Sequence, residues 1–454
     1  MKLKTDFLQS IEHCQGFDKE AFIEAHHQTP VVSIRINQSK TLEQSVVLDD
    51  DNLLVKVPWC DEAYVLKDRP SFTLDPLFHA GAYYVQEASS MFLQYVAKEL
   101  FQEGHGYKAL DLCAAPGGKS TLMAGMHQFG MVISNEIIQS RVAVLQENII
   151  KWGQMKVLVS NNDPADFKNL PGYFDFVMVD APCSGSGLFR KDDKAMNEWN
   201  PELVDFCAAR QKRILLSAIE TVAVGGYLFY STCSFSEEEN EDNLDFLIDT
   251  GLFESVDLLI DPSWNIISSS SKKHGARGYR FYPDKILGEG FFCSVLKKVS
   301  SSSNNRVVYP QSVKTLPLYA QLKDWVNDAE TLHYFQKADD IFVFDSEFLP
   351  DLNLISTVLK LRKSGLRLGE IIREEFVPNH ELAMSTLQSN QIPSIQLDLK
   401  TSLQYLRRET IETTVAQKGW SLVQYKGISL GWIKQVQGKA KNHYPLNWRI
   451  LMRG

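Results

Sequence analysis

The sequence lacks the features that would mark a membrane-spanning, secreted or disulfide-bonded protein. No apolar run approaches the roughly 20 residues that a membrane-spanning helix needs. The N-terminal segment MKLKTDFLQS has no small-residue cleavage site, so we do not expect a signal peptide. The seven cysteines form no CxxC pair and have no regular spacing, which argues against a disulfide framework or a metal site. We expect a cytoplasmic monomer with free thiols and no membrane partner.

Positive charge is scarce over most of the chain but concentrated at its C-terminal end. The formal net charge is -9. Residues 401–454 hold nine Lys and Arg against two Asp and Glu, so this end carries +7 and the remainder carries -16. A basic module on an acidic body is typical of a phosphate-binding surface. A solvated basic face would have the same composition, and charge alone does not separate the two.

Strand-like and helical runs indicate an α/β protein. Residues 1–75 contain strand-like runs at 30–40 and 52–60 and predict a small α+β cap. Residues 76–298 repeat strand, loop and helix, which is the pattern of a parallel sheet covered by helices. The expected strands are 108–114, 131–136, 156–162, 174–181, 227–233 and 291–299. The main expected helices are 140–153 and 202–226, the second ended by a pair of glycines.

The rest of the chain divides into a connecting region and a terminal module. Residues 299–394 predict a linker followed by an intermediate region, because VSSSSNNR at 299–306 is rich in Ser and Asn. Residues 395–454 predict a basic, β-rich module. Within the central segment, the polar run at 268–278 predicts a mobile loop near the sheet edge.

The segment CAAPGGKS at 113–120 follows the first expected strand, where ligands bind in open α/β sheets. Its small residues let the backbone approach a ligand, and the following helix N-terminus favours a carboxylate. We expect cofactor contacts along this loop: Cys113, Ala114, Ala115, Pro116, Gly117, Gly118 and Lys119. A tight turn without a ligand would look similar. A phosphate-binding P-loop does not fit, because the first glycine of GxxxxGK[ST] would fall on Cys113.

Acidic residues stand at the ends of the next three expected strands: Glu136, Asp163 and Asp180. Each acid alone would more often cap the following helix. Three acids beside a glycine turn better describe a nucleoside pocket, since an acid after the second strand commonly binds ribose hydroxyls. No cluster of basic residues is available for a triphosphate. The pattern therefore favours S-adenosylmethionine as the cofactor over a nucleotide.

Two cysteines also occupy strand ends, Cys183 in DAPCSGSG at 180–187 and Cys233 in STCS at 231–234. A buried cysteine more often fills a core than performs catalysis. We assign the cysteines in apolar or helical contexts to that role: Cys14, Cys60, Cys207 and Cys293. The Pro, Gly, Ser and Thr neighbours of the other two are not a packing environment, which favours a catalytic function for this pair.

Two thiols beside an adenosine pocket predict methylation of a pyrimidine at carbon-5. This carbon is a poor nucleophile until a thiolate adds to carbon-6, and the resulting enamine can attack a methyl sulfonium. Asp180, beside the first thiol, is the candidate to hold or protonate the N3 edge. On this reasoning either Cys183 or Cys233 could be the nucleophile.

Three alternative functions fit the sequence less well. An amino-methyltransferase would need an NPPY-like strand end in place of DAPC. A non-catalytic RNA-binding factor gains nothing from two reactive thiols. A methyltransferase for small molecules leaves the basic C-terminal module unexplained.

Three further groups of residues have ordinary structural explanations. The acidic segment at 235–247 is expected to be a solvated helix start that compensates the helix dipole. Arg141 and the basic residues at 272–277 are expected to be exposed charges, with contact to RNA phosphates as the alternative. Most aromatic residues of the C-terminal module are expected in its core, with one or two stacking on bases: Trp420, Tyr425, Trp432, Tyr444 and Trp448.

The motifs together resemble the NOL1/NOP2/Sun family of RNA cytosine-5 methyltransferases. The matching segments are SIRIN (33–37), YYVQEASSM (83–91), DLCAAPGGK (111–119), DAPCSGSG (180–187), GGYLFYSTCS (225–234) and RFYP with GEGFF (280–292). The segment at 430–450 resembles the PUA-like extension of the bacterial RsmF-type branch, which acts on 16S ribosomal RNA.

The resemblance implies a fold and a division of roles. The expected fold is a Rossmann-like class I methyltransferase sheet with one antiparallel strand near its end, an RRM-like N-terminal cap and an RNA-binding C-terminal module. Cys233 would be the nucleophile and Cys183 would help to release the product. The loop from Cys113 to Lys119 and the three strand-end acids would line the pocket for S-adenosylmethionine. The expected partner is ribosomal RNA or the small ribosomal subunit.

Overall fold

The computed structural model describes residues 3–41, 52–301, 307–310, 322–327, 329–412, 418–436 and 439–452. Most of the Ser/Asn-rich segment expected to be a linker, residues 302–306, lies outside these ranges. No helix within them is long and apolar enough to cross a membrane.

The N-terminal part forms a four-stranded antiparallel sheet in the order β2-β3-β1-β4. Its strands are β1 (Val32–Ile36), β2 (Leu53–Lys56), β3 (Ala63–Leu66) and β4 (Tyr83–Val85). Helix α4 (Pro76–His79) lies between β3 and β4. It begins after Asp75, whose carboxylate caps the helix by accepting a hydrogen bond from Leu77 N. The small α+β unit is thus confirmed, and its sheet continues past residue 75.

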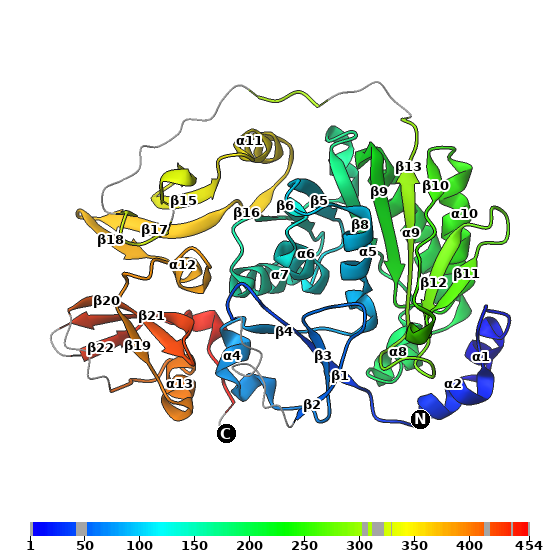
Figure 1. Ribbon diagram of the computed structural model, residues 1–454, viewed down its shortest axis with the longest axis horizontal. Coiled ribbons are helices and arrows are strands. Elements are labelled where there is room, and N and C mark those ends of the chain that lie inside the picture. Colours follow the sequence, from blue (N-terminus) through cyan, green and yellow to red (C-terminus); the bar gives the residue numbers. More distant parts are fainter. Residues whose placement is uncertain are drawn as a thin grey trace.

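Helices α1 (Thr5–Ile11) and α2 (Lys19–Ala25) precede this sheet but pack elsewhere. Their Phe7 and Phe22 are fully buried against Trp199 and Phe235 of the central domain. Figure 1 shows both helices beside α8 (Asp193–Glu198) and β12 (Arg277–Phe281). Helices α1 and α2 therefore pack against the central domain next to the loop that carries Cys233.

A large sheet forms the centre of the molecule in the order β11-β12-β13-β9-β8-β5-β6-β7-β16. The parallel strands are β5 (Tyr107–Asp111), β6 (Phe129–Asn135), β7 (Val157–Ser160), β8 (Phe174–Asp180) and β9 (Val222–Thr232). The antiparallel strands are β10 (Phe253–Ser255), β11 (Ile267–Ser270), β12, β13 (Phe291–Lys298) and β16 (Leu361–Lys363). The expected Rossmann-like sheet with an antiparallel strand after β9 is confirmed.

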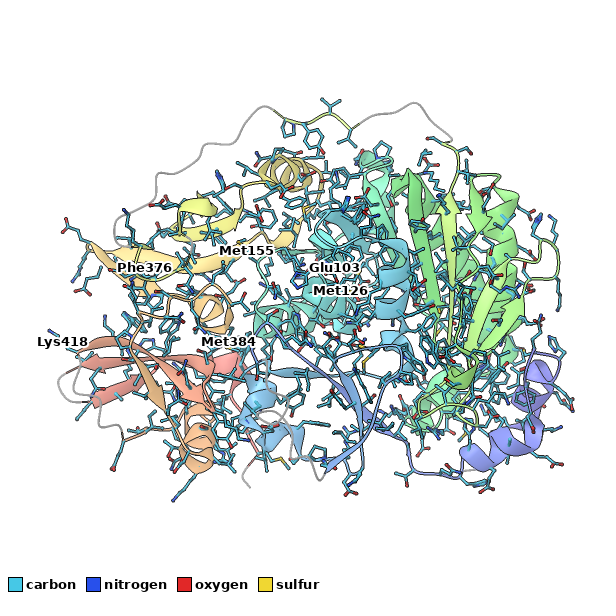
Figure 2. The ribbon with its side chains drawn as sticks, in the orientation of Figure 1. Glu103, Met126, Met155, Phe376, Met384 and Lys418 are labelled. Carbon is cyan, nitrogen blue, oxygen red and sulfur yellow. The ribbon has the colours of Figure 1, made fainter. Side chains whose placement is uncertain are left out.

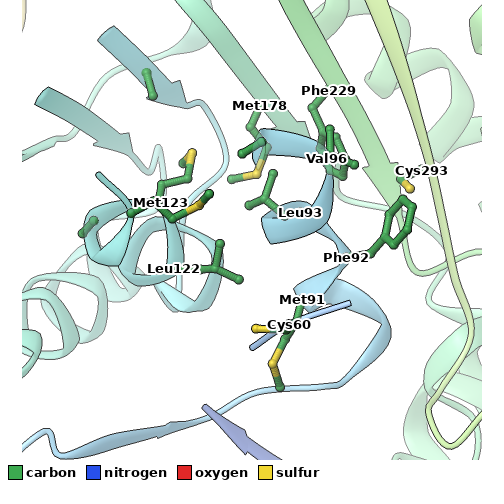
Figure 3. Close-up of a cluster of buried hydrophobic side chains, with 14 of the residues drawn as sticks. Cys60, Met91, Phe92, Leu93, Val96, Leu122, Met123, Met178, Phe229 and Cys293 are labelled. Carbon is green, nitrogen blue, oxygen red and sulfur yellow. The ribbon is translucent and has the colours of Figure 1, made fainter. Parts of the chain in front are cut away.

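Helices cover both faces of this sheet. Successive strand residues such as Ala109 and Leu110 point to opposite faces, and because both are apolar, each face needs a covering layer. One face packs against α5 (Phe92–Leu100), α6 (Gly118–Gly125) and α7 (Gln139–Trp152). The other packs against α9 (Pro201–Thr221), α10 (Glu241–Asp249) and α11 (Leu349–Val358). Figure 3 shows the first core, where Phe92 and Leu93 of α5 and Met123 of α6 meet Met178 and Phe229 of the sheet.

Two local expectations about the central segment are wrong. Helix α9 ends at Thr221, and the glycine pair lies inside β9, where the ladder with β8 shifts register. A Cβ on Gly226 would lie 2.8 Å from Asp175 O, so the glycine permits this irregularity rather than stopping a helix. The polar run at 268–278 is a hairpin of β11 and β12, not a mobile loop. Its turn is held by Asp245, which accepts hydrogen bonds from the amides of Lys273 and His274.

The C-terminal part contains two further four-stranded sheets, in the orders β14-β15-β17-β18 and β19-β20-β21-β22. Their strands are β14 (Leu332–Lys337), β15 (Asp340–Asp345), β17 (Leu366–Ile372), β18 (Glu375–Pro378), β19 (Ser394–Gln396), β20 (Gly419–Tyr425), β21 (Ile428–Val436) and β22 (Lys439–Asn442). The C-terminal part also contains helices α12 (His380–Met384) and α13 (Leu399–Leu406). Trp432 and Tyr444 are fully buried in this part, as expected for core aromatics, whereas Trp420 and Trp448 are half-buried.

The intermediate region is integrated with the central domain. Strand β16 extends the central sheet by pairing Leu361 with Ser160 of β7, and α11 packs on one face of that sheet. Met155, labelled in Figure 2, contacts both the central core and the core under β14–β18. The two halves therefore share packed cores.

Candidate active site

The loop after β5 is shaped by its glycines and held from α7. Gly117 has a φ of 111°, and a Cβ there would lie 3.1 Å from Leu145 Cδ1. Arg141 donates to Ala115 O at 2.5 Å, and Asn148 donates to Pro116 O at 2.8 Å. These contacts fix the backbone of the loop between two adjoining cavities.

The first cavity, called here the Glu136 cavity, has a volume of about 290 Å³. Its wall includes Glu136, Arg141, Pro164, Arg210 and both candidate catalytic cysteines. Glu136 is 3% exposed and accepts from Ile138 N at 2.8 Å, and Arg141 pairs with it at 3.2 Å. Arg141 is exposed, as expected, and its guanidinium also pairs with a carboxylate of the cavity wall.

The second cavity, called here the Lys119 cavity, has a volume of about 370 Å³. Its wall includes Lys119, Asp180, Cys233, Phe291 and residues 84–87 from β4 and the loop after it. Lys119 Nζ lies 2.8 Å from the Asp180 carboxylate and 5.3 Å from the centre of the Phe291 ring. Burial opposes the charge of the ammonium, but Asp180 outweighs this effect and raises the pKa of Lys119.

The two candidate catalytic cysteines meet where the cavities join. Cys183 Sγ and Cys233 Sγ lie 3.0 Å apart, and both residues are half-buried. Their loops follow the adjacent parallel strands β8 and β9, and Gly187 N donates to Cys233 O at 2.7 Å. The hydrogen bond to Cys233, burial and nearby negative charge raise the pKa of Cys183 well above its usual value. The four cysteines assigned to the core are buried.

Cys233 and Cys183 differ in which cavity they face. Cys233 and Asp180 line both cavities, whereas Cys183 lines the Glu136 cavity. The Asp180 carboxylate also accepts from Ser231 Oγ at 2.8 Å, so it is held from two sides. Cys233 can thus contact ligands in both spaces.

Two expected pocket residues lie outside both cavities in the described part of the chain: Gly117, which shapes the loop after β5, and Asp163. Asp163 is exposed, and its carboxylate caps a short 3-10 helix (Pro164–Asn169) by accepting from Ala165 N at 2.9 Å. Its neighbour Pro164 lines the Glu136 cavity instead. A binding role for Asp163 stays a prediction.

Asp111 is a site residue that the sequence reasoning missed. It ends β5, lines the Lys119 cavity and is 1% exposed. One carboxylate oxygen accepts from Ser120 Oγ at 2.6 Å, and the other has no hydrogen-bond partner within the described residues. Burial raises the pKa of Asp111 to about 7. The sequence did contain a signal for Asp111, since it is an acidic residue at the end of the first expected strand, where ligands bind.

The expectation that the acidic segment at 235–247 is a solvated helix start is wrong for four of its six acids. Glu237, Glu239, Glu241 and Asp245 are buried, Asp242 is half-buried, and Glu238 is exposed. Glu241 accepts from Arg280 Nε at 2.7 Å, and Glu239 accepts hydrogen bonds from both cysteine loops. These partners are distant in sequence, which is why composition indicated solvation.

Three family models match the chain in succession. They are the N-terminal domain of 16S rRNA methyltransferase RsmF at residues 3–88, 16S rRNA methyltransferase RsmB/F at 100–297, and the methyltransferase RsmF PUA domain at 392–450. The ribosomal RNA small subunit methyltransferase F of Vibrio cholerae is 30% identical, with 93% of this chain and 92% of the relative covered. The chain belongs to the RsmB/F family of 16S rRNA methyltransferases.

Other relatives agree with this membership. The enzyme of the same name from Vibrio vulnificus is 29% identical over 98% of this chain and 97% of its own. Among solved structures, a methyltransferase homolog protein from Pyrococcus horikoshii is 27% identical, with a TM-score of 0.52 over 65% of this chain and all of that one. NSun6 from the same organism, solved with SFG, has a TM-score of 0.55 at 21% identity and supports the fold.

Membership in the RsmB/F family makes the chain an S-adenosylmethionine-dependent RNA methyltransferase, as its motifs predicted. The Glu136 cavity fits this cofactor chemically. The buried Glu136 carboxylate suits ribose hydroxyls, and the side chains of Ile137 and Ile138, 42% and 43% exposed, offer apolar surface for an adenine. The glycine-rich loop leads into the N-terminus of α6, which favours a carboxylate.

Proposed function

We propose that this RsmB/F family member methylates carbon-5 of a cytosine in 16S ribosomal RNA, with Cys233 as the covalent nucleophile. The observation that carries the proposal is the thiol pair, 3.0 Å apart, at the junction of two cavities of different character. The Glu136 cavity suits the cofactor. The Lys119 cavity, with a cation and a carboxylate beside Cys233, suits the target base.

The chemistry assigned to each residue follows from this placement. The Cys233 thiolate adds to carbon-6 of the cytosine, and carbon-5 becomes nucleophilic. Asp180 holds the N3 edge of the base, and the Lys119 ammonium stabilises negative charge that develops on the ring. S-adenosylmethionine supplies the electrophilic methyl group when it is bound. The carbon-5 proton is then lost to water, the carbon-6 to sulfur bond breaks, and Cys233 is regenerated as a thiolate.

The choice of Cys233 over Cys183 rests on access and charge. Cys233 lines the cavity that holds Lys119 and Asp180, and Cys183 faces the Glu136 cavity. The raised pKa of Cys183 also disfavours its thiolate. We assign Cys183 to assisting the release of the product.

Trapping with 5-fluorocytidine-substituted 16S ribosomal RNA tests this proposal. Fluorine blocks the loss of the carbon-5 substituent, so the enzyme should stall as a covalent RNA adduct on a denaturing gel. The adduct should disappear in Cys233→Ala and remain in Cys183→Ala. Loss only in Cys183→Ala would exchange the two roles, and the absence of an adduct despite measurable cofactor binding would contradict the covalent mechanism.

The C-terminal module is proposed to bind the RNA. A groove of about 1070 Å³ is lined by five basic residues, Arg407, Arg408, Lys439, Lys441 and Arg449, along with two acids. This surface accounts for much of the local charge of +7. Deleting residues 395–454 should lower the RNA affinity and its salt dependence, and unchanged values of both would exclude the module from binding. A cytoplasmic, monomeric enzyme with Asp163 at the cofactor rim completes the proposal.

A further inference from the structure

A single buried carboxylate connects the two cysteine loops. Glu239 Oε1 accepts from Ser184 N at 2.8 Å and from Gln211 Nε2 at 3.0 Å. Glu239 Oε2 accepts from the hydroxyls of Ser184 and Ser234, each at 2.5 Å. Ser184 directly follows Cys183, and Ser234 directly follows Cys233. The carboxylate therefore sets the relative position of the two thiols.

Glu239 is held by hydrogen bonds and has no cationic partner among the described residues. Its side chain is fully buried, and its backbone carbonyl accepts hydrogen bonds from Tyr230 Oη and Asn243 Nδ2. No Lys, Arg or His within the described ranges lies at ion-pair distance from it. Burial raises the pKa of Glu239, and four hydrogen-bond donors to the carboxylate favour its ionised form and reduce this rise.

The charges around the thiol pair are asymmetric. Among the causes that raise the pKa of Cys183, the hydrogen bond to Cys233 and burial come first, and the negative charge of Glu239 adds to them. Lys119 lies on the side of Cys233, because it lines the cavity that Cys233 also lines and that Cys183 does not. Asp180 also lies beside Cys233, but its charge is paired with Lys119 at 2.8 Å. Glu239 has no such cation and accepts two hydrogen bonds from the residue after Cys183, against one from the residue after Cys233.

We propose that Glu239 is a positioning residue that keeps the shared proton on Cys183 and so leaves Cys233 as the thiolate. The inference rests on the proposed function and adds a residue to it. Cys183 donates its S–H to the Cys233 sulfur across the 3.0 Å contact. No proton moves between the two residues. When the carbon-6 to sulfur bond breaks, the departing Cys233 sulfur receives the same hydrogen bond, which stabilises it as a leaving group.

Alkylation by iodoacetamide tests this assignment without RNA or cofactor, because the reagent reacts with thiolates. In the wild-type chain, peptide mass spectrometry at pH 8 should find Cys233 modified at least about tenfold faster than Cys183, equivalent to about one pKa unit. Faster modification of Cys183 would overturn the proposal. This measurement does not depend on whether any variant folds.

The Glu239→Gln variant tests the source of the asymmetry. It keeps the shape of the side chain and removes the charge. In a Cys233→Ala background, Glu239→Gln should raise the alkylation rate of Cys183 about tenfold and shift its pH profile to lower pH. Glu238→Gln, which removes an exposed charge from the adjacent residue, should leave the profile unchanged.

Turnover completes the test. In the Cys233-containing enzyme, Glu239→Gln should lower the methylation rate at least about tenfold with little change in cofactor affinity, and Glu239→Asp should recover part of it. Reduced turnover with an unchanged Cys183 alkylation profile would make Glu239 merely structural and overturn the proposal, as would wild-type turnover. A wild-type chain with the expected alkylation asymmetry but no RNA adduct would count against the proposed function alone.

Discussion

His380 has its ring nitrogens buried where the C-terminal part packs against the rest of the chain, and this burial should make the stability of the folded protein decrease at acid pH. Its ring lies between Tyr444 and Trp448, with centroids 5.4 and 5.0 Å away, and both ring nitrogens are buried without a hydrogen-bond partner. Burial, followed by the nearby charges of Lys151 and Lys40, lowers the pKa of His380 to about 3. Protonation would place a third positive charge in this space.

The effect on stability can be worked out from this shift. Unfolded His380 gains a proton as the pH falls below 6.5, but the folded protein resists until about pH 3. The unfolded state binds more protons across this window, so stability falls as the pH decreases through it. At about 1.4 kcal/mol per pKa unit, moving from pH 8 to pH 5 should cost about 2 kcal/mol. His79 and His443, each with a pKa lowered to about 4 by burial, act in the same direction.

Thermal melting at pH 8 and pH 5 measures this cost. The share of His380, about 2 kcal/mol, corresponds to roughly 2 °C in melting temperature for a chain of 454 residues, so His380→Leu should lose about that much less than the wild type over the same interval. His27→Leu, at an exposed histidine, should behave like the wild type. Equal pH dependence in the wild type and His380→Leu would refute the argument, because the buried ring would then contribute nothing.

Three further predictions concern the proposed site. Glu136→Gln should weaken S-adenosylmethionine binding about tenfold in calorimetry, since a charged hydrogen-bond acceptor is lost, whereas the exposed Glu254→Gln should not; equal affinities would remove Glu136 from the pocket. Lys119→Met should slow adduct formation with 5-fluorocytidine RNA about 100-fold at unchanged cofactor affinity, and a cofactor defect instead would reassign its cavity. Lys441→Ala and Arg449→Ala, both at exposed positions, should each weaken RNA binding and reduce the slope of its salt dependence by about 1; a slope equal to that of the wild type would argue against phosphate contact.

The central sheet could be predicted because the pattern of each strand and of the loop after it lies within a few consecutive residues. Each parallel strand is a short apolar run, and its functional residues follow directly at its end, as in the loop from Cys113 to Lys119. Pairing across the sequence could not be predicted in the same way. Glu239 looked solvated because its partners Ser184 and Gln211 lie 55 and 28 residues away. The glycines at 225–226 looked like a helix stop because a shift in strand register leaves no separate signature.

The pairing of β16 with β7 has a consequence for how the enzyme can be divided. Without residues 361–363, β7 would become the outer strand of the sheet, with its backbone amides and carbonyls open to another chain. The amide of Asn161 would also lose the carbonyl of Lys360, and Asn162 would lose the Lys360 amide, directly beside the loop that carries Pro164. A fragment ending at residue 298 would thus expose the backbone of β7 to aggregation with other chains. It would also lose hydrogen bonds that hold the residues next to the proposed cofactor pocket. A fragment that retains residues up to 363 keeps β7 paired with β16.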